Sequence, residues 1–116
     1  MEYKIIFTSG HEHDEELRER ETRGDILLQT EAGDYYELNF VTLNRIRAEF
    51  HAESACYLED NMVILHEVTK DNILGCVPVL HRWMFYKRWM PLSPAVLDKY
   101  YMPREPWVVY SVVVDP

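Results

Sequence analysis

The chain has 116 residues, the length of one compact domain with a single core. Hydrophobic residues make up 47% of it and aromatic residues 13%, which excludes a disordered chain, and no apolar run approaches the roughly 20 residues that span a bilayer. The 20 Asp and Glu residues outnumber the 12 Lys and Arg residues, and the resulting net charge of −8 opposes nucleic-acid binding and favours a basic protein partner.

The negative charge is concentrated in the first part of the chain. Residues 1–70 carry 16 acidic and 7 basic side chains, whereas residues 71–116 carry 4 acidic and 5 basic side chains. The N-terminus lacks the cationic region and cleavage site of a signal peptide, so we expect a cytoplasmic protein.

The first elements are a strand and a highly charged segment. Residues 2–8 have the β-branched and aromatic content of a strand. Residues 11–24 contain one aliphatic side chain, Leu17, among charges, which predicts a solvated loop or a short exposed helix that is mobile over residues 11–23.

A hairpin is predicted over residues 25–42, with Gly33 in its turn. Its second strand has alternating side chains, with Tyr36, Leu38 and Phe40 on one face and Tyr35, Glu37 and Asn39 on the other.

Thr42 is a plausible N-cap for a helix through Phe50, with an apolar stripe at Leu43, Ile46 and Phe50. Residues 55–59 and 62–68 follow as a second hairpin or one long bent strand. The apolar run 62–65 indicates burial on both faces, which is typical of a central strand.

Helical spacing resumes after Asp71, where Ile73, Val77, Leu80 and Met84 share one face. Pro78 predicts a helix that is weak or kinked over residues 75–78 and regular over 79–88.

Two further elements complete the chain. Ser93-Pro94 starts a short helix to Tyr101, and residues 107–114 (WVVYSVVV) form a terminal strand. The sequence therefore predicts one α+β domain over residues 1–116, with a mainly antiparallel sheet of about five strands and two or three helices.

The segment 81–90 (HRWMFYKRWM) crowds aromatic and cationic residues together. In a regular helix, Trp83 and Met84 would join Leu80 in the core, while Phe85 and Trp89 would form a second apolar ridge beside Arg82. We expect residues 90–107 to cover this ridge; left exposed, it would be a binding hot spot.

Recognisable catalytic motifs are absent from the sequence. There is no G-x-S-x-G, H-E-x-x-H or glycine-rich phosphate loop, so we expect no catalytic residue and no cofactor. His11 and His13 lie among carboxylates that could bind a divalent cation, but a solvated segment is the preferred interpretation, and we expect no metal. His66 is predicted to be a buried core histidine, and Cys56 and Cys76 to be reduced, mostly buried thiols.

The runs CYLEDNMVILHEVTKDNIL (56–74) and HRWMFYKRWMPLSPAVLDKYYMP (81–103) resemble small bacterial single-domain proteins, and the whole chain looks like the immunity proteins of bacterial polymorphic and contact-dependent toxin systems. That resemblance implies a cytoplasmic protein that binds a cognate toxin domain, often a basic nuclease, and blocks its active site. No residue role is transferred from it.

These observations lead to two hypotheses for the function. The first is a non-catalytic inhibitor, monomeric or weakly dimeric, that binds a toxin and neither nucleic acid nor membrane; the alternative is a small enzyme or ligand-binding domain with an aromatic pocket around His66 and His81. For the inhibitor, the candidate contacts are acidic residues of the first part and the aromatic ridge: Asp14, Glu15, Glu16, Glu19, Glu31, Asp34, Glu37, Arg82, Phe85 and Trp89.

Overall fold

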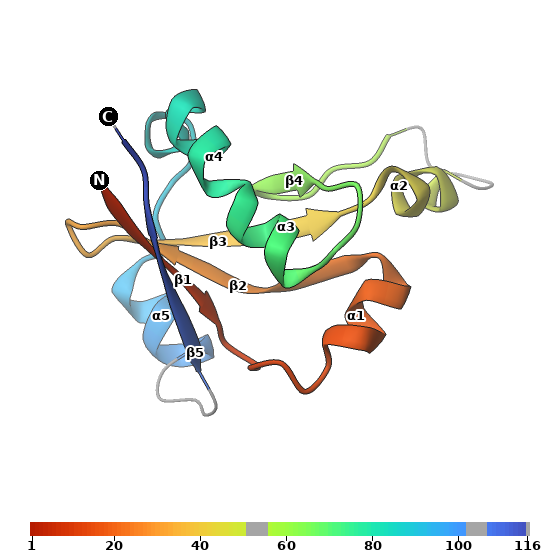
Figure 1. Ribbon diagram of the computed structural model, residues 1–116, viewed down its shortest axis with the longest axis horizontal. Coiled ribbons are helices and arrows are strands. Elements are labelled where there is room, and N and C mark those ends of the chain that lie inside the picture. The colour runs from red at the N-terminus through yellow and green to blue at the C-terminus, as the bar shows by residue number, and fades with distance from the viewer. Residues whose placement is uncertain (51–55, 102–106, 116) are drawn as a thin grey trace.

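A five-stranded sheet organises the molecule (Figure 1). The computed structural model describes residues 1–50, 56–101 and 107–115. In these ranges the strands are β1 (Glu2–Phe7), β2 (Thr22–Gln29), β3 (Tyr35–Val41), β4 (Met62–Ile64) and β5 (Val108–Val113), in the spatial order β4-β3-β2-β1-β5. All neighbouring pairs are antiparallel except β3 and β4, which are parallel. The predicted single α+β domain with a mainly antiparallel sheet is confirmed.

The helices are short and outnumber the two or three that were expected. They are α1 (Asp14–Arg20), α2 (Leu43–Glu49), α3 (Lys70–Gly75), α4 (Val77–Trp83), the 3-10 turn η1 (Phe85–Lys87) and α5 (Pro94–Tyr100). Thr42 and Ser93 cap α2 and α5 through their side chains, as predicted. None of the helices in the described part of the chain has the length and apolar character needed to span a membrane.

One face of the sheet carries the main core. Its apolar side chains on β1, β2 and β3 pack against α3, α4 and η1; the fully buried ones include Tyr3, Ile5, Phe7, Ile26, Leu28, Leu38 and Phe40. From the helical side, Ile73, Val77 and Phe85 are also fully buried. The predicted alternation along β3 is therefore confirmed, with Tyr36, Leu38 and Phe40 facing this core.

The opposite face of the sheet carries α5 (Figure 1). Ile6 and Leu27, which are opposite each other in the β1–β2 register, are buried on this face. The hydroxyl of Tyr101 donates to Oε2 of Glu37 at 2.6 Å, and the backbone N–H of Leu92 donates to the carbonyl of Tyr35 at 2.7 Å. These bonds fix the chain around α5 against β3.

The prediction of a long central strand over residues 55–59 and 62–68 is wrong. Residues 56–60 form no strand, residue 55 lies outside the described ranges, and β4 is a three-residue edge strand. Met62 and Val63 are half-buried and Ile64 is exposed. The sequence pattern could not distinguish the two positions, because an edge strand that is covered by other elements shows the same continuous apolar run as a central strand.

The prediction of a regular helix over residues 79–88 is also wrong. The break at residues 75–78 and the position of Pro78 in a first helical turn are as predicted, but α4 ends at Trp83 because Met84 adopts the left-handed conformation (φ 57°). This reversal turns Phe85 into the main core, where it contacts the rings of Tyr3 and Tyr36. Trp83 and Met84, expected in the core, are 42% and 41% exposed.

Candidate functional site

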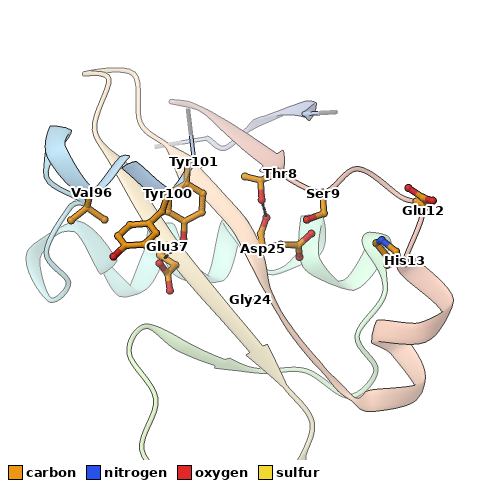
Figure 2. A pocket seen from close by; sticks show the side chains of 10 residues that line it. All are labelled: Thr8, Ser9, Glu12, His13, Gly24, Asp25, Glu37, Val96, Tyr100 and Tyr101. Carbon is orange, nitrogen blue, oxygen red and sulfur yellow. Dashed lines mark hydrogen bonds between the residues drawn. The ribbon is translucent and has the colours of Figure 1, made fainter. Parts of the chain in front are cut away.

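An open groove of about 770 Å³ lies on the α5 face of the sheet (Figure 2). It is bounded by α5 and the residue that follows it on one side, and by the segment between β1 and α1 on the other. Its lining residues, all within the described ranges, include three carboxylates and no Lys or Arg: Thr8, Ser9, Glu12, His13, Gly24, Asp25, Glu37, Val96, Tyr100 and Tyr101. The groove is therefore acidic, with aromatic side chains at one end.

A bulge in β2 shapes the floor of the groove. The β2–β3 register shifts between Arg23 and Ile26, so that Gly24 and Asp25 together oppose Asn39. A Cβ atom on Gly24 would lie 2.9 Å from Oδ1 of Asn39, inside normal contact distance. A side chain at position 24 would therefore displace the side chain of Asn39, which donates to the carbonyl of Asp60 at 2.7 Å.

Arg23 holds the bulge from the other side of the strand. Its buried guanidinium donates to Asp25 at 2.7 Å, to Asp14 at 2.6 Å and to the carbonyl of Gly10 at 2.9 Å, and it lies 4.8 Å from the ring centre of Phe7. Burial acts to lower the pKa of Arg23, but the hydrogen bonds and charges of the two carboxylates outweigh burial and raise the pKa. One cation thus ties β2 to the start of α1.

The three carboxylates of the groove have different surroundings. Asp25 is paired with Arg23, Glu37 is half-buried and accepts from Tyr101, and Glu12 is exposed. Because Arg23 is shared between Asp14 and Asp25, it leaves a net negative charge at this end of the sheet. Glu37 and Glu12 lie at opposite ends of the groove with Asp25 between them (Figure 2), so cationic groups could be bound at more than one point along it.

The predicted acidic residues do not gather on one face. Those on α1 lie at the start of β2, where Glu15 pairs with Arg18 and Glu16 with Arg20. Glu31 and Asp34 are at the β2–β3 turn, and the eight residues of β2 place them about 25 Å from α1. Of the predicted set Asp14, Glu15, Glu16, Glu19, Glu31, Asp34 and Glu37, only Glu37 lines the groove.

The predicted aromatic ridge does not form. Phe85 is fully buried in the main core and Trp89 is half-buried against Phe85 and Trp83. Arg82 is exposed, whereas the cation that stacks on an indole is Arg88, 4.6 Å from the ring centre of Trp83.

The histidines also depart from expectation. His66 is exposed, not buried. His81 has a partner that the sequence did not indicate, because its Nδ1 lies 2.6 Å from the hydroxyl of Tyr3. His66 lines a separate depression near α2, and His81 is not among the residues that line it. Cys76 is buried as expected, but Cys56 is exposed.

The H-x-H pair is split between two roles. His11 is held by Asp14 at 2.8 Å and by the hydroxyl of Tyr110 at 2.7 Å, whereas His13 lines the groove. Among the described residues, no three His, Cys, Asp or Glu side chains are grouped as metal ligands would be.

Sequence reasoning missed most of the groove. Glu12, Asp25, Tyr100 and Tyr101 come from a loop, a strand bulge and a helix end, and no motif spacing connects them. Gly24 was predicted to end the charged segment 11–24, whereas β2 begins at Thr22. A glycine inside a strand is typical of a bulge, so this signal depended on the strand boundary.

Comparison with known proteins gives no relative: no family model matches the chain, and no curated protein and no solved structure is detectably similar to it.

Proposed function

We propose that the chain is a non-catalytic binding protein that neutralises a basic protein partner, in the manner of bacterial toxin immunity proteins. The observation that carries this proposal is the composition of the groove: three carboxylates, two tyrosines and no Lys or Arg among its lining residues. A Lys or Arg side chain of the partner enters the groove at the end that holds Glu37 and Tyr101, and a second basic group meets Glu12 at the other end (Figure 2).

The charge of the whole molecule supports the same kind of partner. A net charge of −8 attracts a basic domain over long range and speeds its encounter, while the fixed groove determines how long the complex lasts. Glu37 is already oriented by the hydroxyl of Tyr101, so it loses little conformational entropy on binding.

The test uses a fluorescently labelled arginine-rich peptide as a probe and measures its binding by fluorescence anisotropy over a salt series. The double variant Glu12→Gln, Glu37→Gln removes two charges from the groove, and the new amide oxygen at position 37 can still accept from Tyr101. We expect this variant to weaken binding about tenfold. The matched control is the double variant Glu31→Gln, Asp34→Asn, which removes two charges from the distant turn and should weaken binding less than about twofold.

Equal losses in the two double variants would reduce the effect to net charge and overturn the groove as the site. Identification of the partner requires affinity capture from the native host with the wild type and both variants as baits. A basic protein that is retained by the wild type and the turn variant but lost from the groove variant would support the proposal, and retention by all three would contradict it.

A further inference from the structure

The outer edge of β5 is an unpaired strand edge. In the described part of the chain, β5 pairs with β1 on one side and with no strand on the other (Figure 1). Its sequence, VVYSVV, contains no charge and no proline, and Val109 and Val113 are 48% and 71% exposed. An exposed edge of this composition lacks the charges and prolines that usually prevent strand pairing between molecules.

The hydrogen-bonding groups that face outward on β5 can be assigned from its register. Met1 and Val114 exchange two backbone hydrogen bonds, of 3.1 and 2.8 Å, so they are a hydrogen-bonded antiparallel pair. Since such pairs alternate along the ladder, Val112, Tyr110 and Val108 also bond to β1. The N–H and C=O groups of Val109, Ser111 and Val113 therefore face away from the sheet.

We propose that β5 pairs antiparallel with β5 of a second copy of this chain around a two-fold axis at Ser111. The two five-stranded sheets would then join into one continuous sheet of ten strands. This inference does not depend on the proposed function, because the groove is not part of the β5 edge.

With Ser111 on the axis, both the outward-facing backbone groups and the side chains of β5 find partners in the second copy. Ser111 opposes Ser111 of the second copy, and Val109 opposes Val113, so all three outward-facing residues form hydrogen-bonded pairs. The two most exposed valines of the strand become cross-strand neighbours on the α5 face. On the core face, Tyr110 opposes Val112, an aromatic and β-branched pair that stabilises antiparallel strands.

Local charge does not oppose a second copy at this edge, although the net charge of −8 repels it at long range. No charged side chain lies within β5, and the nearest carboxylate along the chain is Asp115, two residues beyond the strand. A strand pair of this length buries less surface than a stable interface requires, so the dimer is weak and concentration-dependent.

The register is tested by cysteine cross-linking in a Cys56→Ser background. Cys76 does not compete, because it is buried and its pKa is raised to about 12 by burial. In a hydrogen-bonded pair the two Cα atoms are about 5.5 Å apart, within disulfide range. Under mild oxidation, Ser111→Cys should therefore give a covalent dimer that reducing agent reverses.

Val109→Cys is the matched control, because residue 109 opposes residue 113 and should not cross-link to itself. A mixture of the single variants Val109→Cys and Val113→Cys should cross-link as a heterodimer. Dimer from Val109→Cys alone at the rate of Ser111→Cys would contradict the register.

Sedimentation equilibrium tests the association without a covalent bond. Ser111→Pro removes an outward-facing N–H and no β1–β5 hydrogen bond, so it should weaken the dimer at least about tenfold while the circular dichroism spectrum stays unchanged. Val113→Lys, which adds like charges across the axis without a backbone change, should act in the same direction. The proposal would be overturned if the wild-type protein stays monomeric over about a hundredfold concentration range. A dimer dissociation constant that neither substitution changes would overturn it as well.

Discussion

Arg23 is the residue that links the groove to the rest of the molecule. It is 3% exposed and its donors reach two carboxylates and one backbone carbonyl. A buried cation is tolerated only when it is paired, and the same pairing holds Asp25 at the groove and Asp14 at the start of α1. Polar contacts thus anchor a segment in which Leu17 is the one aliphatic side chain.

Replacement of Arg23 should be strongly destabilising. Arg23→Met keeps much of the volume but leaves Asp14 and Asp25 without their cation, and we expect the free energy of unfolding to fall by about 3 to 5 kcal/mol. Urea denaturation followed by tryptophan fluorescence measures the change. The control is Arg20→Met, which removes an exposed pair with Glu16 and should cost less than about 1 kcal/mol. Similar losses for both variants would contradict the assigned role of Arg23.

At the scale of an element, the end of α4 decides the fate of the aromatic segment. Met84 takes a left-handed conformation that a residue with a side chain rarely adopts, and the chain reverses into η1. The reversal places Phe85 against the sheet and leaves Trp83 at the surface. Tertiary burial of Phe85 compensates the local strain at Met84.

Glycine at position 84 should therefore stabilise the fold. Met84→Gly removes the steric cost of positive φ, and we expect the free energy of unfolding to rise by up to about 1 kcal/mol. Val79→Gly, at an exposed site inside α4 with ordinary helical geometry, should lower it by a similar amount. Thermal unfolding measured by circular dichroism separates the two, and destabilisation by both variants would show that Met84 is not strained.

At the scale of the whole molecule, charge is distributed unevenly. Residues 72–97 contain no Asp or Glu, and their cations Arg82, Lys87 and Arg88 are exposed around Trp83 and Tyr86. All 20 acidic residues lie outside this range, among them four on α1, three in the groove and two at the β2–β3 turn. The molecule therefore has one weakly basic aromatic region within a strongly acidic whole.

This distribution predicts no binding of single-stranded nucleic acid at physiological salt. Three cations beside a Trp offer stacking, but the net charge of −8 repels a phosphate backbone that needs several cations to hold it. Fluorescence anisotropy of a labelled oligonucleotide should stay flat on titration with the protein. Binding that is lost in Arg88→Gln, but not in Arg45→Gln on α2, would contradict this prediction.

The sequence by itself determined the strands and the faces that bury them. Period-two alternation placed Tyr36, Leu38 and Phe40 in the core, and β-branched runs marked β1 and β5, because these signals depend on neighbours along the chain. Side-chain caps at Thr42 and Ser93 were predictable for the same reason.

Only the tertiary structure decided the rest. Whether β4 is central or at the edge, whether Phe85 or Trp83 is buried, and which carboxylates meet in a groove all depend on elements far apart in the sequence. Glu12, Asp25, Glu37 and Tyr101 line one groove because the bulge in β2 and the docking of α5 against β3 bring a loop, two strands and a helix end to the same face. No periodicity encodes such a convergence, since its energy comes from contacts that exist only once the sheet has formed.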